Sequence, residues 1–423
     1  MAFEAQHDGA GAAPSVRPPA MHAPREQAPL ELVARLRPIA DEIGRRWRLV
    51  HRDEQAFPDI AAAEFGRLPA SLEFDVGAFV RWALASERLP MPSTGDEFGE
   101  PPVTVMVGDG FKFDVLFWLD GTTTIHQHMF SGAFRVLAGS SIHGDHRFTA
   151  RRRINSRLQL GELVPGRTEL LRPGDVRPIH PGSGLIHSLF HLERPSVTLV
   201  ARTPGEDDVR PQFDYLRPGI ALDPSRAHPD LLKRVQLLRM MMQIGHPELE
   251  DHVLLLLRGA DLEATVRMLR QPQLIAYPSV RAWLEAECPH ADARALLLPA
   301  YDEAIRMAGL VTWRSLLVEP QHRFLLALLM NLSSRGDLLA FVRQRYRVEP
   351  AALVMRWIEE IIAVQARCPE LAPVIDIPTD EASLAALRSA LEAPAAAESE
   401  AVSASTAAGL RSSVFLRPLL ERS

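Results

Sequence analysis

The sequence predicts an α+β fold, in which a jelly-roll β-barrel is preceded by helices and followed by a longer all-helical region. Three observations predict it. Residues 30–85 carry apolar side chains at three- and four-residue spacing, which is typical of amphipathic helices. Residues 103–203 contain about eight short apolar or alternating segments separated by Gly, Pro and Asp, which is typical of a barrel. After Pro218 the helical spacing returns.

These changes in pattern divide the chain into five regions. We expect a disordered N-terminus at residues 1–28, helices that pack on the barrel at 29–90 and the barrel itself at 91–218. An all-helical domain at 219–393 and a flexible tail at 394–423 should follow. The N-terminus is rich in Ala and Pro and lacks an apolar core segment, which predicts disorder and no signal peptide. In the tail, Val414, Phe415 and Leu416 are candidates for docking onto the fold or a partner.

The helices and strands follow from side-chain spacing. Leu32, Leu36, Ile39, Ile43 and Trp47 form an apolar stripe that must pack on something. Turn residues such as Gly and Asp separate the expected strands from one another. These strands are Val103–Val107, Phe111–Leu119, Thr122–His128, Phe134–Leu137, Arg147–Ile154, Arg157–Leu163, Leu185–His191 and Val197–Arg202.

Composition narrows the classes of function. Of the 423 residues 47% are hydrophobic and 24% charged, the balance of an ordinary soluble protein. The net charge of −6 argues against a nucleic-acid partner, which would favour a basic surplus. No run approaches the roughly 18 consecutive apolar residues of a membrane helix. Two distant cysteines, Cys288 and Cys368, form no disulfide framework, which predicts a cytoplasmic location.

A His-x-His motif on an expected strand indicates a metal site. His126 and His128 are two residues apart, so on a strand both side chains project to the same face. Imidazoles so placed can each offer a ring nitrogen to one ion. The best candidate for a third ligand is His187, which a Gly-rich turn at residues 182–184 delivers at the start of an apolar strand. Ordinary polar residues on a solvated strand face are the alternative.

These two motifs resemble those of the cupin superfamily. The first family motif contains Gly, His-x-His, Glu and a later Gly, and the second places Pro and Gly ahead of a His. His126, His128, Gly139, Gly184 and His187 match, whereas Gly121 and Pro181 are each displaced by one position. Gly132 stands where the family has its Glu ligand. The resemblance implies a cupin barrel of the three-histidine metal type.

Within that superfamily the local resemblance is to the thiol (cysteine) dioxygenases. It lies in Gly110–Trp118 and the following Ile125–His128, which are similar to the strand pair leading to their iron site. Those enzymes also carry a Ser-x-His-x-Tyr run and an Arg that holds the substrate carboxylate. The corresponding strand, Ser196–Arg202, has neither His nor Tyr, and no matching Arg lies near Val103–Val107. The resemblance therefore implies the metal site but not cysteine as substrate.

A site made of three neutral imidazoles leaves the ion's charge uncompensated and about half of an octahedral set of positions open. It would attract anionic or chelating substrates, with O₂ beside them. Fe(II) is the expected metal, and Zn, Ni, Mn or Cu are alternatives. Gly132 would leave space where the carboxylate usually stands; alternatively it marks a β-bulge or a non-catalytic cupin.

Further polar residues are weaker candidates for a role in catalysis. His191 would face the same interior as His187 but about 13 Å along the strand at roughly 3.3 Å per residue, so it is a candidate catalytic or buried structural residue. Tyr215 and Arg202 lie at or beyond the end of the last strand, where Tyr215 is a second catalytic candidate and a structural role is the alternative for both. His143 and His146 lie in a stretch that resembles a surface turn.

The leading functional hypothesis is a mononuclear iron oxygenase acting on a small chelating substrate, such as a thiol or an amino-acid-like compound. Its partners would be that substrate and O₂, without nucleic acid or membrane. The helices would cover one barrel mouth and supply selectivity or a homodimer contact. One alternative is a non-redox metal-dependent isomerase, lyase or hydrolase, which would need a general base. Another is a metabolite-binding protein without turnover.

Overall fold

The structure, a computed structural model, describes residues 31–70, 72–91, 99–119, 123–204, 211–225, 227–332, 334–367 and 380–393, together with Ser413, Leu416 and Leu419. The expected disordered N-terminus at residues 1–28 lies outside the described residues, as do Cys368 and most of the expected tail at 394–423. No helix in the described ranges combines the length and apolar character needed to cross a membrane.

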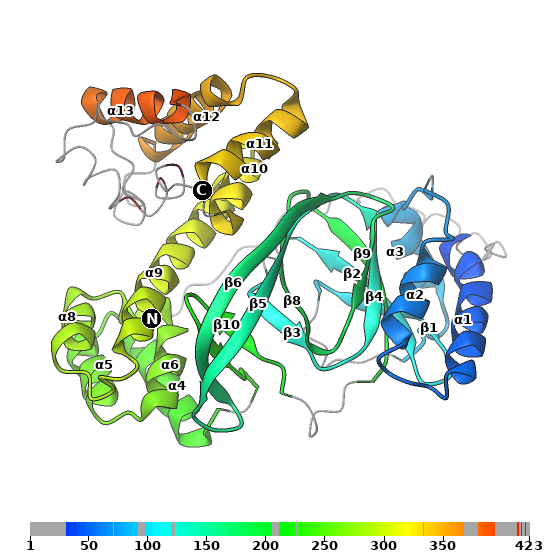
Figure 1. The fold of residues 1–423 in the computed structure, drawn as a ribbon, viewed down its shortest axis with the longest axis horizontal. Coiled ribbons are helices and arrows are strands. Elements are labelled where there is room, and N and C mark those ends of the chain that lie inside the picture. The colour runs from blue at the N-terminus through cyan, green and yellow to red at the C-terminus, as the bar shows by residue number, and fades with distance from the viewer. Residues whose placement is uncertain are drawn as a thin grey trace, which may run out of the picture.

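Three helices precede the barrel and cover one of its faces (Figure 1): α1 (Glu31–Leu49), α2 (Phe57–Phe65) and α3 (Val76–Ala85). The apolar stripe of α1 is buried, as its spacing predicts. It shares a core with the outer face of the sheet that contains Phe113 and Leu199. Buried Arg135 ties this layer to the barrel, because its guanidinium donates to the carbonyls of Phe65 (2.8 Å), Leu68 (3.1 Å) and Pro69 (2.7 Å).

Eleven strands in the described residues form the barrel: β1 (Pro102–Val107), β2 (Lys112–Trp118), β3 (Ile125–His128), β4 (Gly132–Ala138), β5 (Ser141–Arg153), β6 (Leu158–Leu171), β7 (Val176–Ile179), β8 (Gly182–His191), β9 (Ser196–Arg202), β10 (Asp214–Leu216) and β11 (Ile220–Leu222). One sheet has the order β1-β2-β9-β4-β7. The other has the order β10-β11-β6-β5-β8-β3 and closes through β10 and β3. This confirms the predicted jelly-roll barrel.

The predicted strands all correspond to observed ones, with two kinds of difference. The sequence missed the short strands β7, β10 and β11, which have three or four residues each. It also placed a turn before Arg147, whereas β5 already begins at Ser141 and runs for 13 residues. The long β5–β6 pair extends beyond the barrel, with mostly exposed residues from Arg147 to Arg153.

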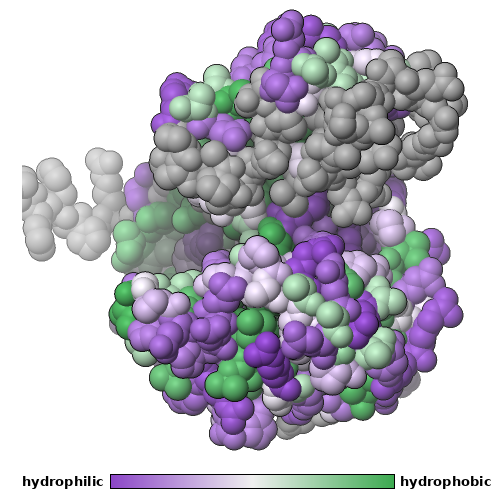
Figure 2. Space-filling view, turned by 90° about the vertical axis from the view of Figure 1, so that its left-hand side faces the viewer, coloured by the Kyte–Doolittle hydropathy of each residue, from purple (hydrophilic) through white to green (hydrophobic). Residues whose placement is uncertain are grey.

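The region after the barrel is entirely helical in the described residues. Figure 1 shows that α9 runs between two groups of helices, and Figure 2 looks onto the molecule from the side of these helices. Its helices are α4 (Pro229–Gln243), α5 (Leu249–Arg258), α6 (Leu262–Leu269), α7 (Pro272–Ile275), α8 (Pro278–Ala286), α9 (Arg294–Leu316), α10 (Pro320–Asn331), α11 (Arg335–Tyr346), α12 (Pro350–Gln365) and α13 (Glu381–Glu392).

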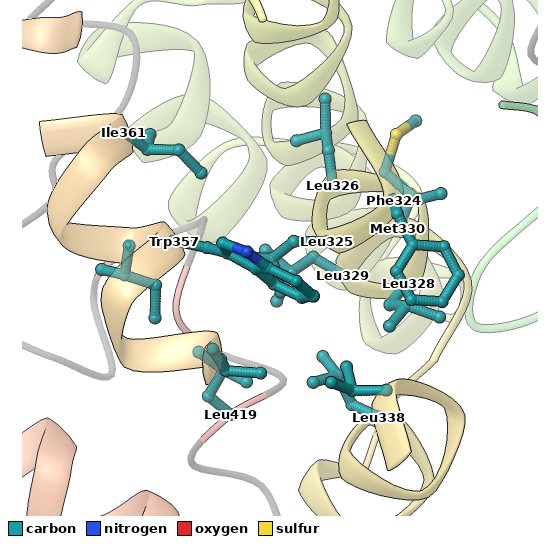
Figure 3. Packing of buried hydrophobic residues seen from close by; sticks show 14 of the residues in the cluster. Phe324, Leu325, Leu326, Leu328, Leu329, Met330, Leu338, Trp357, Ile361 and Leu419 are labelled. Carbon is teal, nitrogen blue, oxygen red and sulfur yellow. The ribbon is translucent and has the colours of Figure 1, made fainter. Parts of the chain in front are cut away.

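The C-terminal helices share their cores with the barrel. In Figure 3, Trp357 projects from α12 toward Leu325 and Leu329 of α10. The same cluster contains Ile142 of β5 and Phe190 of β8, and it also includes Leu416 and Leu419. A second cluster joins α4 to α9 with residues of β6 and β11. Apolar burial of this kind is the main stabilising term in folding, so the helices and the barrel stabilise one another.

Helix α6 begins at a side-chain cap. The Asp261 carboxylate accepts a hydrogen bond from the Ala264 backbone N–H at 2.7 Å, which satisfies one of the unpaired donors of the first turn. We expect Asp261→Ala to lower the free energy of unfolding by about 1 kcal/mol, measured by urea denaturation. The control is Asp41→Ala, which removes an exposed aspartate inside α1. Equal destabilisation by both variants would contradict the assignment of the cap.

Candidate metal centre

Three buried histidines converge inside the barrel. His126 and His128 project from β3, and His187 lies directly opposite His126 on β8. All three are at most 4% exposed. One ring nitrogen from each lies within 4.8 Å of the others, and no other His, Cys, Asp or Glu group in the described residues meets this condition. The predicted convergence of these rings is therefore confirmed.

The ring orientations fit a metal ion. His126 Nδ1 donates to the Thr124 carbonyl at 2.8 Å, so in the neutral ring Nε2 carries the lone pair. The Nε2 atoms of His128 and His187 face each other at 2.9 Å. Two nitrogens about 2.0–2.1 Å from one ion and 90° apart would lie about 2.9 Å from each other. Two nitrogens on opposite sides of one ion can be at most about 4.2 Å apart, which is twice the ligand distance. The ligand nitrogens of the triad lie within 4.8 Å of one another, so a small side-chain adjustment allows all three to share the ion.

The surroundings keep the rings neutral, as metal ligation requires. Burial lowers the pKa of His126, and it lowers the pKa of His128 and His187 well below the usual value for histidine. Desolvation is the largest cause in each case, because the charged imidazolium loses its hydration in the barrel interior. The lone pairs are therefore available for a cation over the whole physiological pH range.

A chain of hydrogen bonds holds the His187 ring from behind. His143 Nε2 lies 3.0 Å from His187 Nδ1, and His143 Nδ1 lies 3.2 Å from Glu169 Oε1. One set of tautomers satisfies both contacts: His187 donates to His143, and His143 donates to the carboxylate. The carboxylate is also paired twice with Arg177, at 2.7 and 2.6 Å. His143 and Arg177 hold the pKa of Glu169 far below its usual range, so it is anionic.

This chain corrects the prediction for the segment around His143. The sequence resembled a surface turn there, but His143 and His146 lie on β5 and are only 2% and 7% exposed. Strand β5 pairs with β8, which brings Gly144 opposite Ser188 and His143 opposite Leu189. Gly139 and Ser140 do connect β4 to β5, but Ser141 and Gly144, which suggested a longer turn, are buried in β5. A carboxylate such as Glu169 that orients a metal-ligating imidazole through a hydrogen bond is a recurrent feature of metal sites.

Gly132 has a different role from the predicted one. A Cβ atom at this position would lie 2.4 Å from the Ala201 carbonyl oxygen of the paired strand β9. The glycine therefore allows the two backbones to approach each other closely and leaves no open space for a ligand. A carboxylate side chain at this position is sterically excluded, so the donor set among the described residues consists of imidazoles.

The triad borders a small cavity of about 50 Å³. At roughly 10–15 Å³ per water molecule, this space holds a few waters, which limits a substrate to a few non-hydrogen atoms. Apart from the three histidines, Thr123, Thr198 and Arg202, its described lining is apolar: Leu116, Trp118, Phe130, Phe134, Ile179, Leu189 and Val200. Arg202 is the one permanently charged side chain among these residues.

Arg202 gives the cavity a positive end. Its Nε donates to buried Asp114 at 2.7 Å, and its guanidinium lies 5.6 Å from the centre of the Phe130 ring. Lys112 Nζ is also 3.4 Å from the same Asp114 oxygen. Two cations thus contact the same carboxylate, which holds Arg202 at the cavity. The sequence places Arg202 at the end of the last strand, where a structural role or closure of the barrel mouth is expected, and the structure shows that it lines the cavity.

The two predicted catalytic residues lie outside the cavity lining. The His191 ring stacks on Trp118, with centroids 4.6 Å apart, and its Nδ1 is 2.9 Å from Ser141 Oγ. Tyr215 lies on β10, and its hydroxyl donates at 2.6 Å to Gln127, whose side chain points away from the face that carries His126 and His128. Burial raises the pKa of the Tyr215 phenol. Their catalytic roles stay predictions.

The neutral His191 makes stability depend on pH. Burial lowers its pKa from 6.5 to about 3, so between these values the unfolded chain takes up a proton that the folded chain does not. The free energy of unfolding therefore falls as the pH falls below 6.5. Between pH 7 and pH 5.5, the free energy of unfolding should fall by about 1 kcal/mol less in His191→Gln than in the unmodified protein. Urea denaturation followed by tryptophan fluorescence measures this difference. A pH dependence of stability in His191→Gln that is identical to that of the unmodified protein would contradict the assignment.

Comparisons with known proteins return cupins, with low similarity. No family model matches the chain, and no curated protein matches it. The DMSP lyase DddQ from Ruegeria pomeroyi DSS-3 is 16% identical over 42% of this chain and 95% of its own, with a TM-score of 0.22. A hydroquinone 1,2-dioxygenase, PnpCD, is 18% identical over 26% of this chain and 68% of its own, with a TM-score of 0.21. A cupin-2 domain protein from Shewanella frigidimarina is 13% identical over 26% of this chain and 85% of its own, with a TM-score of 0.18.

At such identities and TM-scores, no activity follows from these likenesses. The fold is established by the chain's own strand order and by the buried histidines that face its interior. The protein is therefore built around a cupin-like β-barrel with a buried three-histidine group, preceded by helices and followed by an all-helical region.

Proposed function

We propose that the protein is a mononuclear non-haem iron oxygenase that acts on a small chelating substrate of the thiol or amino-acid type. His126, His128 and His187 would hold Fe(II). The observation that carries the proposal is the buried three-imidazole group beside a small, largely apolar cavity. A ferrous ion held there would supply the electrons that allow O₂ to react with an organic molecule.

The donor set supports open-site metal chemistry. Three imidazoles leave several positions of a six-coordinate ion for exogenous ligands, as in other iron oxygenases that use three protein ligands. The close approach at Gly132 keeps a fourth protein ligand away from these positions. The aromatic and aliphatic lining excludes water from the reacting groups and strengthens the electrostatic interactions inside the cavity.

The lining also favours redox chemistry over non-redox reactions that use a side-chain general base. Such a base must lie within hydrogen-bond reach of the substrate. Among the described residues that line the cavity, no Asp, Glu, Lys or Tyr is present, and each His belongs to the metal-binding group. A reaction in which the ion itself activates the second reactant requires no such base.

The position of Arg202 supports an anionic substrate. Arg202 lines the cavity together with the three histidines, and its Nε donates to buried Asp114 at 2.7 Å. A carboxylate or thiolate that binds the ion would have its charge balanced by the ion and by Arg202 together, and an arginine holds a carboxylate in a fixed geometry. We propose that Arg202 orients the substrate in this way.

The test is oxygen consumption by protein purified without O₂ and loaded with Fe(II). Small thiols, amino acids and hydroxy acids would be supplied as substrates, and mass spectrometry would identify the products. We expect substrate-dependent O₂ uptake that is lost when Zn(II) replaces Fe(II). Absence of uptake with every compound would contradict the oxygenase proposal. Turnover with Zn, Ni or Mn would instead identify a non-redox enzyme, and tight binding without turnover a metabolite-binding protein.

A further inference from the structure

A second and larger cavity lies between the barrel and the C-terminal helices. Its volume is about 390 Å³, within the range of small-molecule sites. Strands β3 and β10 form one wall, α6 and α7 a second, and α9 with the end of α10 a third. It borders the outer face of β3, whereas the metal-binding histidines project from the inner face. Thr123 lines both cavities.

Most of this cavity is apolar because α9 presents small side chains to it. Ala300, Ala304 and Ala308 are four residues apart and so lie on one helical face. Leu269 and Met307 add to the same apolar surface. Alanine leaves open the volume that larger side chains would fill at these positions. The resulting space accommodates an elongated apolar group alongside the helix.

The charged residues of the lining are unequally compensated. Arg270 is paired with Asp214 at 2.6 Å, and Glu303 lies 3.3 Å from Arg306. Arg217, by contrast, has no ion pair with any residue in the described part of the chain. A partly buried guanidinium without a counter-ion favours an anion from outside.

Further polar groups line the same cavity. Ser188 and Asn331 line the cavity, 3.3 Å apart between Oγ and Oδ1. His146 lies on the strand next to Ser188, is 7% exposed, and neither of its ring nitrogens has a hydrogen-bond partner among the described residues. His146 is not among the residues that line the cavity, so the polar contacts for a ligand come from lining residues such as Ser188 and Asn331.

We propose that this cavity binds an organic acid with an apolar body, such as a medium-chain carboxylate. The carboxylate lies at Arg217, near Ser188 and Asn331, and the apolar chain lies along the alanines of α9. The proposal is independent of the reaction at the metal centre. Because Ser188 directly follows His187 and Thr123 lines both cavities, the bound acid lies next to the strands that carry the histidines.

The test is calorimetry on metal-free protein, so that no carboxylate can bind through an ion at the histidines. Octanoate should bind with a stoichiometry of one, and 1-octanol about tenfold more weakly because it lacks the charge. Arg217→Gln should weaken octanoate binding about tenfold and remove its advantage over octanol. Ala304→Trp should abolish binding by filling the cavity. The control Arg153→Gln removes an exposed arginine from β5 and should leave the affinity unchanged.

Failure of octanoate to bind the unmodified protein would overturn the proposal. So would octanoate binding that is unchanged in Arg217→Gln, or equal affinities for the acid and the alcohol. Near-ultraviolet circular dichroism checks the fold of each variant, and the Arg217→Gln result is decisive even where a tryptophan at position 304 disturbs folding. His187→Ala should retain octanoate binding whether or not the oxygenase proposal holds, which separates the two sites.

Discussion

Replacing His187 with alanine is expected to weaken the binding of Fe(II) or Co(II) by roughly 10²–10³-fold. Metal-binding free energies of about 10–16 kcal/mol for a four-ligand site amount to about 2.5–4 kcal/mol per ligand. His187 lies on a different strand from the other two histidines, so its loss leaves the ion with two donors from β3 alone. Isothermal calorimetry with Co(II), and metal content by mass spectrometry after desalting, measure the effect.

The matched control for this variant is His146→Ala. His146 is also a buried histidine, and it lies opposite Ile186 on the strand next to β8, but it does not belong to the group that converges on one point. We expect it to bind Co(II) like the unmodified protein. Equal loss of metal in both variants would show that folding, and not ligation, is being measured. Unchanged binding in His187→Ala would contradict the metal centre itself.

The second large effect is expected from His143→Ala, which should weaken Co(II) binding by about 10–100-fold without removing a ligand. The His143 ring accepts a hydrogen bond from His187 Nδ1 and donates one to the Glu169 carboxylate, whose negative charge strengthens both bonds. Without it, His187 loses the partner that fixes its tautomer and orientation. The absorption spectrum of bound Co(II) should change as well, because the ligand field depends on ring orientation.

A conservative replacement distinguishes positioning from packing. In His143→Gln, the amide oxygen can accept from His187 and the amide nitrogen can donate to Glu169, so affinity and spectrum should largely recover. His143→Phe preserves volume but neither hydrogen bond, and should behave like His143→Ala. Full Co(II) affinity in His143→Phe would show that the ring only fills space.

The sequence contained enough information to predict the barrel and its three histidines. Spacing by two residues placed His126 and His128 on one strand face, and a Gly-rich turn marked the strand of His187. These are local signals, and strand geometry converts them directly into a shared direction. The further requirement, that β3 and β8 pair with His126 opposite His187, comes from the topology of the barrel.

The supporting residues could not be predicted in the same way. Glu169 lies 26 residues beyond His143, and only the pairing of β5 with β6 brings the two together. Around His143, Ser141 and Gly144 are residue types that usually mark a turn, but they are buried residues of β5. Arg202 lies at the strand end expected from the sequence, but its approach to the cavity depends on buried Asp114 of the neighbouring strand.

Helical spacing likewise predicted the C-terminal helices but not the surface on which they pack. A stripe such as Val354 to Ile361 indicates that a face is buried, whatever covers it. The structure shows that this face belongs to a cluster that also contains Ile142 and Phe190 of the barrel, and that α10 lies against both α12 and β5. The barrel and the helices that follow it therefore share hydrophobic clusters.

Two arginines connect the helices to the strand that carries His187. Arg314 of α9 donates to the His191 carbonyl at 3.1 Å, and Arg323 of α10 donates to the Leu192 carbonyl at 3.3 Å. Arg314 also lies over the Phe190 ring, 4.2 Å from its centre. A barrel expressed alone, as residues 99–225, would lose these donors and expose Phe190 to water. We therefore expect it to aggregate, and any attempt to minimise this protein must retain α9 and α10.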